Sequence, residues 1–335
     1  MNLSRTYKAM AQGNDPWENL ALEEYMVNTI GKGEVLFYLW QNQHTVVIGR
    51  NQNAWKECHI DRLESEGGKL ARRLSGGGAV YHDLGNLNFS FIMDRQLYDL
   101  DRQLSLICNV VQSLGIDAKR SGRNDILVEG KKFSGNAFYF RPGVALHHGT
   151  LLVHTDLTRV QRYLNVSNQK LQSKGVQSVR SRVVNLQELQ PSLSVEELQH
   201  ALMAEFDREY NFRAIPWQDA DPVGGPEHRQ KLTEKYAGES WRYGKSPDCN
   251  VRFGKRFDWG EIEFNLDVKK GKIEQAMVFS DSLEPDCVDR LNQVLPGAFL
   301  GAKELGGLVE ELQRSDPHPL FEDILEYLRQ SPWHG

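Results

Sequence analysis

The chain of 335 residues lacks most of the features that mark secreted, membrane-bound or zinc-binding proteins. Its four cysteines, Cys58, Cys108, Cys249 and Cys287, are scattered, and no two of them form a CxxC pair. This excludes a zinc ribbon and a disulfide scaffold and predicts a reduced, cytoplasmic protein. No apolar run approaches the roughly 18 residues that a membrane helix needs. The N-terminal residues also lack the apolar core of a signal peptide, so we expect no membrane association.

A large excess of either charge is also missing, since the formal net charge is −5. Residues 246–335 carry 10 Lys+Arg against 17 Asp+Glu, which leaves 30 against 28 for residues 1–245. No region is basic enough for a nucleic-acid binder, so we expect no nucleic-acid partner. A slightly basic body with an acidic appendage is compatible with anionic ligands that bind to the body.

The pattern of apolar residues predicts a mixed α+β architecture. Helical patterns are expected at Asp15–Ile30, 61–66, 97–114, 157–164, 195–210, 286–295 and 319–329. Strands are expected at 35–40, 45–49, 87–93, 125–128, 133–140 and 146–154, followed by a three-strand meander from residue 251 to residue 281. Breaker clusters occur at 219–226 and 245–250. We therefore predict a domain boundary near residue 245, with a mixed-sheet domain at 1–245 and a small α+β domain at 246–335.

The most informative segment is RRLSGGGAVYHDLGN, from Arg72 to Asn86. Three successive glycines remove every Cβ over a whole turn, which lets backbone amides approach a phosphate or an extended ligand. The two arginines before them supply planar donors that suit phosphate or carboxylate. The segment is neither a Walker loop, because Ala79 follows the glycines, nor a dinucleotide fingerprint, because Tyr81 stands where a glycine is needed. A glycine-rich β-turn without a ligand is the alternative.

A second segment, GRNDILVEGKKFSGNA, runs from Gly122 to Ala137. Strand alternation places Lys132 and Ser134 on one face and Lys131 and Phe133 on the other, so we expect one lysine to point inward and one to be solvated. Asn124 and Asp125 stand just before a strand. They either cap a turn or supply a carboxylate to a magnesium ion that bridges phosphates.

The third segment, LHHGTLLVHTDL, runs from Leu146 to Leu157. Neighbouring strand residues face opposite ways, so His147 and His148 cannot bind one metal ion together. No HExxH motif and no Cys/His cluster occurs, and we expect no zinc. GxSxG is absent, and no cysteine lies between Cys108 and Cys249, so covalent serine or thiol catalysis has no support.

Together the three segments resemble, in order and spacing, those of bacterial lipoate–protein ligase A. Residues 15–24 and 45–58 are also similar to that family, and residues 246–335 resemble its C-terminal accessory domain. The resemblance implies a catalytic domain of the biotin/lipoate ligase type. It also implies a two-step reaction, in which lipoate and ATP form lipoyl-AMP and pyrophosphate, and a protein lysine then takes the lipoyl group and releases AMP.

The resemblance further implies the partners. The expected acceptors are lipoyl domains of the acyltransferase subunits of 2-oxo acid dehydrogenase complexes and the glycine cleavage H protein. Monomers are common in this family, so a monomer is expected here. The substrates would be ATP and lipoate, with Mg²⁺ as the metal ion and Asp125 as its candidate contact.

The site residues follow from the same resemblance. Lys132 matches the family's essential lysine, which contacts both lipoate and phosphate and stabilises charge. The residues implied for ATP are Arg73, Gly78, Ala79, Val80, Tyr81, Asn124, Asp125 and Lys132. The residues implied for lipoate are Ser75, Gly76, Gly77, His82, Lys132, Ser134, Gly135, Ala137 and His148.

Three alternatives share this fold. Biotin protein ligases have arginines between the glycines of their phosphate loop, and here the loop reads Gly76-Gly77-Gly78-Ala79. Octanoyltransferases pair the corresponding lysine with a cysteine nucleophile, which this stretch lacks. A regulator that only binds an acyl-adenylate would not need Arg73 and Lys132, and both are present.

Overall fold

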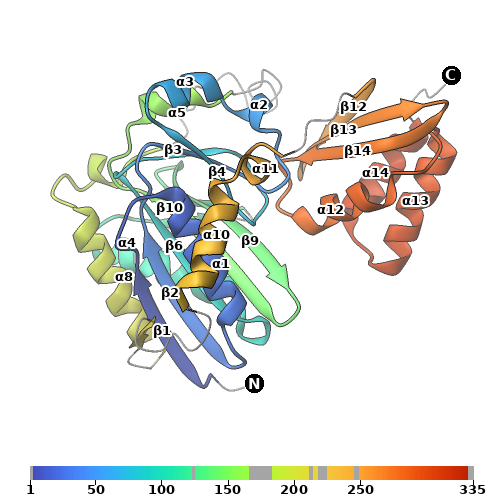
Figure 1. The fold of residues 1–335 in the computed structure, drawn as a ribbon. Helices are drawn as coiled ribbons and strands as arrows, with labels where there is room; N and C mark the ends of the chain where they lie inside the picture. Colours follow the sequence, from blue (N-terminus) through green and yellow to red (C-terminus); the bar gives the residue numbers. More distant parts are fainter. Residues whose placement is uncertain are drawn as a thin grey trace.

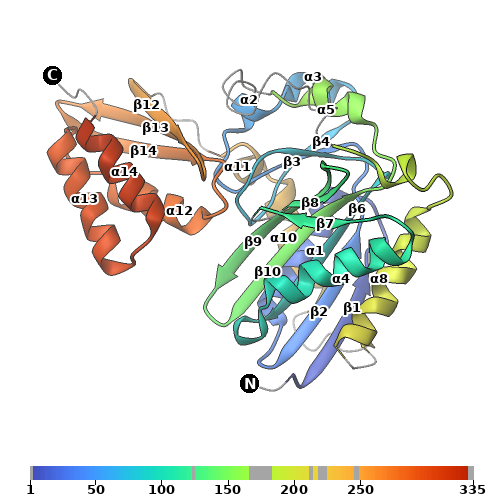
Figure 2. The ribbon, with the colours of Figure 1, turned by 180° about the vertical axis from the view of Figure 1, so that it is seen from behind.

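A computed structural model describes residues 3–122, 125–165, 183–210, 214–217, 225–244 and 249–330. Figures 1 and 2 show a larger N-terminal body and a smaller unit that begins at β12, in orange and red. The larger body contains a mixed sheet of eight strands in the order β11-β1-β2-β6-β10-β9-β8-β7. The β1–β2 and β1–β11 pairs are parallel and the other pairs antiparallel.

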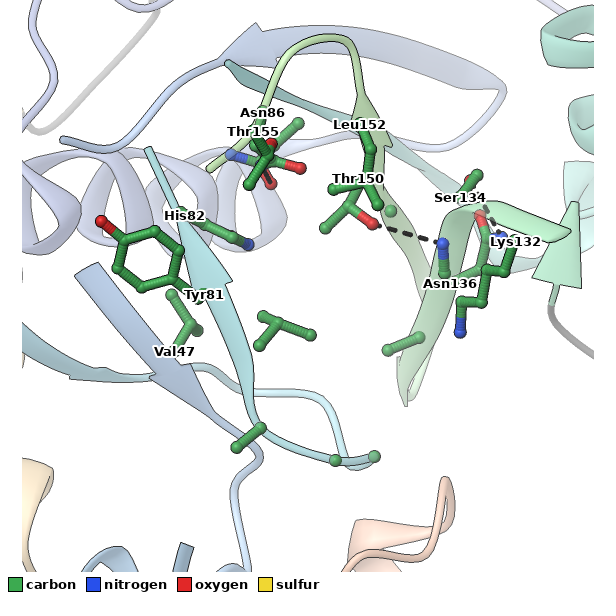
Figure 3. A pocket seen from close by; sticks show the side chains of 18 of the residues that line it. Val47, Tyr81, His82, Asn86, Lys132, Ser134, Asn136, Thr150, Leu152 and Thr155 are labelled. Carbon is green, nitrogen blue, oxygen red and sulfur yellow. Dashed lines mark hydrogen bonds between the residues drawn. The ribbon is translucent and has the colours of Figure 1, made fainter. Parts of the chain in front are cut away.

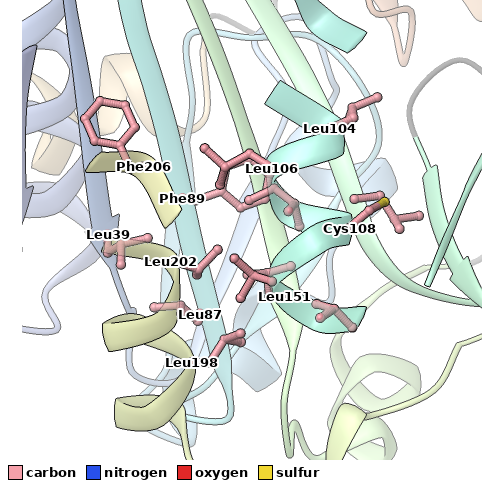
Figure 4. Close-up of a cluster of buried hydrophobic side chains, with 14 of the residues drawn as sticks. Leu39, Leu87, Phe89, Leu104, Leu106, Cys108, Leu151, Leu198, Leu202 and Phe206 are labelled. Carbon is pink, nitrogen blue, oxygen red and sulfur yellow. The ribbon is translucent and has the colours of Figure 1, made fainter. Parts of the chain in front are cut away.

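The strands of this sheet span β1 Arg5–Met10, β2 Glu34–Trp40, β6 Asn86–Asp94, β7 Lys119–Ser121, β8 Asp125–Val128, β9 Lys131–Arg141, β10 Val144–Leu152 and β11 Ile215–Pro216. Helices α4 (Leu100–Ser113) and α8 (Val195–Glu209) pack on one face of the sheet. Figure 4 shows Leu104, Leu198 and Phe206 of these helices against Phe89 and Leu151 of the strands. Helices α1 (Pro16–Thr29) and α10 (Gly225–Ala237) cover the other face. Every strand in the centre of the sheet is therefore buried on both sides.

A second, three-stranded sheet lies at one end of the large one, in the order β4-β3-β5. It is formed by β3 Thr45–Ile48, β4 Lys69–Arg72 and β5 Val80–His82. Its outer face packs against α3 (Ile60–Ser65) and α5 (Leu157–Tyr163), near the short helix α2 (Ala54–Glu57). The glycine-rich segment joins β4 to β5, so the position of this segment is fixed at both ends by the small sheet.

The C-terminal unit has a core of its own. Strands β12 Val251–Phe257, β13 Gly260–Lys269 and β14 Lys272–Ser280 form the expected meander. Helices α12 (Pro285–Val294), α13 (Ala302–Ser315) and α14 (Pro319–Gln330) pack on it. Its buried core residues all lie between residues 262 and 328, so among the described residues this apolar core is separate from those of the larger body.

Most expected elements are confirmed, and the exceptions have local causes. Helix α13 was missed because Gly306 and Gly307 lower its helix propensity, although Leu305, Val309 and Leu312 are buried at helical spacing. Helix α10 begins inside the breaker cluster, at Gly225, because a proline in the first turn costs no hydrogen bond. Helix α10 itself, the short helices α2 and α11 (Glu239–Arg242), and the short strands β1, β4, β5, β7 and β11 were also missed. Residues 219–224 and 245–248 of the two breaker clusters lie outside the described residues.

The N-terminal cap of α1 is formed as the sequence predicts. The Asp15 side chain accepts hydrogen bonds from the backbone amides of Trp17 and Glu18, with Pro16 at the first helical position. The cap fixes the start of a helix that carries Glu23 to the interior of the protein, where its side chain is fully buried. No described helix is both long and apolar enough to cross a bilayer.

Candidate active site

A cavity of about 390 Å³ lies between the small sheet and the β9–β10 part of the large sheet. Figure 3 shows Val47, Tyr81 and His82 on one side of it and Lys132, Thr150 and Leu152 on the other. Most of its wall is apolar, with Trp40, Ala137, Leu157, Val160, Leu164 and Val183 among the lining residues. Such a site suits a ligand with an apolar body and a small number of polar groups.

The glycine-rich loop forms one wall of the cavity. Gly77 has a φ of +88°, a conformation that favours glycine, and Gly77 and Gly78 both line the cavity. A Cβ on Gly49 would lie 2.3 Å from the carbonyl oxygen of Gly77, so the loop lies directly against the end of β3. Gly76 faces the other way, and a Cβ there would lie 2.1 Å from the carbonyl oxygen of Ser282. Gly49 and Gly76 therefore allow close backbone approach on two sides of the loop, Gly77 allows its positive φ, and a Cβ on Gly78 would meet nothing within 4 Å.

The two arginines before the loop bind protein carbonyl groups. Arg72 donates to the carbonyls of Gly49, Arg50, Gln52, Trp241 and Arg242, and it does not line the cavity. It thus joins the residues after β3 to the end of α11 (Glu239–Arg242). The expectation of an anion-binding pair of arginines is therefore wrong for Arg72.

Arg73 lines the cavity, but its guanidinium group is bonded to the loop itself. Its Nη2 donates to the carbonyl of Gly76 at 2.7 Å and to the carbonyl of Gly78 at 2.8 Å. The same guanidinium group also donates from Nε to the carbonyl of Gly76 and to Oγ of Ser75, and from Nη1 to the carbonyl of Val47. Burial lowers its pKa to about 10, which leaves it cationic at neutral pH. Because Arg73 draws these loop carbonyls toward itself, they do not face a ligand in the cavity.

Lys132 lies on the opposite wall. Its Nζ is 2.6 Å from Oδ1 of Asp125, and its side chain passes over Gly135, where a Cβ would lie 2.8 Å from Nζ. Lys131 is exposed and does not line the cavity. The prediction that one lysine points inward and the other is solvated is confirmed for the described structure.

The predicted facing of Ser134 is wrong, and a β-bulge is the reason. Ile126 pairs with Ser134 while Leu127 pairs with Lys132, so Phe133 is an extra residue in β9. Phe133 joins the core under α4. Ser134 follows it to that side, with its Oγ 3.5 Å from Nδ2 of Asn136. Lys132 and Ser134 therefore point to opposite faces, although both residues contribute to the cavity wall.

The two adjacent histidines of β10 face opposite layers, as predicted. His147 lies between Oε1 of Gln103 in α4 and Oδ1 of Asn136, at 2.7 and 2.8 Å. His148 lies on the α1 side, with Nδ1 2.9 Å from Oε1 of Glu23 and Nε2 2.6 Å from Oγ of Ser75. Among the described residues no group of three or more His, Cys, Asp or Glu side chains could hold a metal ion.

His82 is buried in the cavity wall, and its tautomer follows from its neighbours. Asn19 donates to Oδ1 of Asn42, so Nδ2 of Asn42 faces Nδ1 of His82 at 3.2 Å. Nδ1 then accepts, and the proton lies on Nε2, for which no hydrogen-bond partner is found among the described residues. Burial first, and then the nearby Arg73 guanidinium group and His148 ring, lower the pKa of His82 to about 3, so the His82 ring is neutral.

The C-terminal unit also reaches the cavity, which the sequence patterns did not indicate. Leu283 lines the cavity, and the amide of Gly77 donates to the carbonyl of Ser282 at 2.8 Å. Around this contact Arg50 pairs with Asp289 at 2.7 Å, and Lys56 pairs with Glu261 and Glu263 at 2.6 and 2.7 Å. The loop between β14 and α12 therefore closes one side of the cavity.

The structure brings most of the candidate residues together. Those that line the cavity are Arg73, Gly77, Gly78, Ala79, Val80, Tyr81, His82, Lys132, Ser134, Gly135, Ala137 and His148. Ser75 and Gly76 belong to the loop but do not line the cavity, since Ser75 accepts from Arg73 and Gly76 faces Ser282. Asp125 contacts Lys132, and Asn124 lies outside the described residues. Sequence reasoning missed Trp40, Val47, Val160 and Leu283, because an apolar residue that lines a cavity has the same local pattern as one in a core.

The chain matches two family models along its length. Residues 15–207 match the lipoyl protein ligase A/B catalytic domain, and residues 246–323 match the bacterial lipoate protein ligase C-terminus. The chain belongs to the lipoate–protein ligase A family. It is thus an enzyme of the ligase class, with the α+β fold of that family.

Two curated relatives are similar over nearly the whole chain. The lipoate-protein ligase A of Psychrobacter cryohalolentis is 40% identical over 324 residues, which cover 94% of this chain and 95% of that protein. The lipoate-protein ligase A of Blochmanniella pennsylvanica is 39% identical over 319 residues, covering 92% of this chain and 93% of that protein.

Solved structures of ligases share the fold. LipL1 of P. falciparum in complex with lipoate has a TM-score of 0.84 and 26% identity, covering 97% of this chain and all of that one. A lipoate-protein ligase A bound with ATP has a TM-score of 0.59 and 28% identity, covering 73% of this chain and 99% of that one. A bipartite lipoate protein ligase of Thermoplasma acidophilum, studied with its E2 lipoyl domain, has a TM-score of 0.61 and 29% identity, covering 75% of this chain and all of that one.

Proposed function

We propose that this chain is an ATP-dependent lipoate–protein ligase that works in two steps at the cavity between its sheets. In the first step a carboxylate oxygen of lipoate attacks the α-phosphorus of ATP, and pyrophosphate leaves. In the second, the ε-amine of a lysine on an acceptor domain attacks the acyl carbon of lipoyl-AMP. An amide bond forms, the amine loses a proton, and AMP leaves.

The placement of Lys132 across an apolar cavity from the glycine loop is the observation that carries this proposal. Two anions must meet in the first step, and negative charge grows on the phosphate oxygens. A fixed ammonium group stabilises that charge, and a desolvated site increases its effect. The ion pair with Asp125 holds the Lys132 side chain over Gly135 in the cavity wall. Lys132 therefore acts through its charge, without forming a covalent bond.

The cavity divides between the two substrates. We assign the acyl chain of lipoate to the apolar part near His82, Gly135, Ala137 and His148, with Gly77 and Ser134 contributing backbone. We assign the phosphates to Gly78, Ala79, Val80 and Tyr81, and to Asn124 and Asp125. Ser75, Gly76 and Arg73 act through the shape of the loop, because their polar groups are bonded to each other and to the loop backbone.

Magnesium is proposed as an ion that arrives with ATP. Asp125 offers one carboxylate beside Lys132, and the described residues contain no larger acidic cluster near it. Such a set fits Mg²⁺, which is usually held by one or two carboxylates together with substrate phosphates. When bound, the ion would neutralise charge on the phosphates that leave as pyrophosphate.

The domain division and the partners are part of the same proposal. We assign catalysis to residues 1–245 and an accessory role to residues 246–335. The acceptors would be lipoyl domains of 2-oxo acid dehydrogenase acyltransferase subunits and the glycine cleavage H protein. We propose a cytoplasmic monomer, without a role for nucleic acid or membranes.

Release of pyrophosphate from ATP in the presence of lipoate tests the function. Activity that requires both substrates supports a ligase, whereas ATP-independent transfer from an octanoylated carrier would support a transferase. A transferase would need a nucleophilic cysteine, and no described cysteine lines the cavity. Binding of lipoyl-AMP without turnover would identify a binding protein.

A further inference from the structure

A buried chain of hydrogen bonds connects helix α1 to the glycine loop. It begins at Glu23 of α1, passes through His148 of β10 to Ser75, and ends at Arg73. The residues Glu23, His148 and Ser75 are at most 5% exposed, and Arg73 is 7% exposed. No step of the reaction described above uses Glu23.

The direction of each hydrogen bond follows from its ends. Glu23 has only acceptors, so Nδ1 of His148 carries the proton that points to Oε1 at 2.9 Å. With that single proton on the ring, Nε2 of His148 is an acceptor, and the hydroxyl of Ser75 donates to it across 2.6 Å. Oγ of Ser75 in turn accepts from Nε of Arg73 at 3.0 Å. The chain thus begins at a cationic donor, Arg73, and ends at a carboxylate acceptor, Glu23. Between them Ser75 and His148 each accept one hydrogen bond and donate one.

The far end of this chain is itself fixed. Oε1 of Glu23 also accepts from the hydroxyl of Ser90 at 2.5 Å, and Oγ of Ser90 accepts from the indole of Trp40 at 3.0 Å. Ser90 and Trp40 belong to the central strands β6 and β2. The chain is therefore anchored in the rigid large sheet, whereas its other end lies in a loop.

The chain spans the two walls that the reaction needs. His148 pairs with Ala137 in the sheet that carries Lys132 and Gly135, while Ser75 begins the loop that carries Gly77 and Gly78. The bond between Ser75 and His148 therefore ties the glycine loop to the wall of Lys132. Arg73 completes the tie, because the same guanidinium group holds the carbonyls of Gly76 and Gly78.

We propose that Glu23, His148 and Ser75 are positioning residues that fix the glycine loop opposite Lys132 through Arg73, and so set the affinity for the nucleotide. This rests on the proposed function only in the assignment of the phosphates to the loop. The carbonyls of Gly76 and Gly78 point to Arg73, and the amide of Gly77 is bonded to Ser282. We therefore assign the phosphate contacts to the backbone amides of Gly78 and Ala79. Without the bond between Ser75 and His148 the glycine loop has more conformations. ATP then binds only the fraction of molecules whose loop has the binding conformation, which raises the Kd.

The experiment measures ATP binding by calorimetry, in the presence of Mg²⁺, together with the tautomer of His148 by ¹H–¹⁵N NMR. The variants are Ser75→Ala, Glu23→Leu and Glu23→Gln. In the wild type we expect His148 to carry its proton on Nδ1. Ser75→Ala should raise the Kd for ATP about tenfold, and Glu23→Leu should also move the proton of His148 to Nε2. Glu23→Gln keeps an oxygen that accepts from Nδ1, so it should retain the tautomer and most of the affinity.

His147→Gln is the matched control, since His147 is equally buried on the same strand but faces α4. It should lower the melting temperature and leave ATP affinity unchanged. A Kd for folded Ser75→Ala within twofold of the wild type would overturn the proposal, as would a wild-type proton on Nε2 of His148. If the wild type binds ATP but releases no pyrophosphate with lipoate, the proposed function fails and the binding and NMR results still decide the positioning role.

Discussion

The backbone amide of Gly77 donates a hydrogen bond of 2.8 Å to the carbonyl of Ser282, more than 200 residues later in the chain. This contact joins the centre of the glycine loop to the segment between β14 and α12 of the C-terminal unit. Leu283, the next residue, lines the cavity. The C-terminal unit is therefore part of the cavity wall in this arrangement, and its position bears directly on the chemistry.

We expect Gly76→Ala to disturb this contact, because the new Cβ would lie 2.1 Å from the carbonyl oxygen of Ser282. The obstacle is backbone, so the two units must move apart. Gly78→Ala is the matched control for docking, since nothing lies within 4 Å of its Cβ. Small-angle scattering should show a more extended particle for Gly76→Ala only, and equal profiles for both variants would contradict the prediction.

Loss of the whole C-terminal unit should affect the two half-reactions differently. We expect residues 1–245 to form lipoyl-AMP poorly, because one wall of the cavity is missing, but to transfer lipoyl groups from added lipoyl-AMP to an acceptor domain. Pyrophosphate release and acceptor modification measured separately on the soluble fragment would check this. An equal loss in both would mean that residues 246–335 only support folding.

Replacing Lys132 by Ala should reduce the rate of lipoyl-AMP formation by on the order of 10²–10³, the usual cost of losing one preorganised electrostatic contact. Transfer from preformed lipoyl-AMP should also slow. Lys131→Ala is the control, since Lys131 is exposed and away from the cavity. An inactive Lys131 variant together with an active Lys132 variant would reverse the assignment of the two lysines.

Gly135→Ala tests the position of the Lys132 ammonium group without removing it. The new Cβ would lie 2.8 Å from Nζ and Cε of Lys132, and a flexible side-chain end can move away at little cost in stability. We expect an unchanged melting temperature and a lower kcat for lipoyl-AMP formation. A variant that keeps its kcat would show that the observed Lys132 position is not needed.

The stability of the protein should fall in mild acid because of its buried neutral histidines. Burial lowers the pKa of His147 to about 3, below the value of about 6.5 in an unfolded chain. Between these values the unfolded state binds a proton that the folded state does not, so the free energy of unfolding decreases as pH falls from about 6.5 toward 3. The loss is up to about 1.4 kcal/mol per pH unit for each such histidine.

Denaturant unfolding from pH 7 to pH 4.5 measures this dependence. His147→Gln should be less stable at pH 7 but have a shallower slope with pH. His200→Gln, at an exposed position on α8, should keep the wild-type slope. An unchanged slope for His147→Gln would show that another group causes the acid sensitivity.

The helices, the strands and the segments that line the cavity were predictable where local pattern and chemistry agreed. The capped start of α1, the alternation of β6 and the turns of the C-terminal meander each depend on residues close in sequence. Helix α13 and the facing of Ser134 were not found, because a glycine pair hid the helical stripe and a bulge shifted the alternation of β9 by one residue. A bulge depends on the partner strand, so a single strand does not reveal it.

By itself, the sequence determined which residue types were available for the chemistry: three glycines in a row, a lysine beside a Ser-Gly pair, two adjacent strand histidines and no cysteine near them. The tertiary structure alone decided their roles. In the folded chain Arg72 and Arg73 donate to backbone carbonyls. Glu23 is connected to Ser75 through His148, and Ser282 lies against Gly77. The reason is physical: a buried polar group must find a partner, and that partner is chosen by proximity in the folded chain and not by position along it.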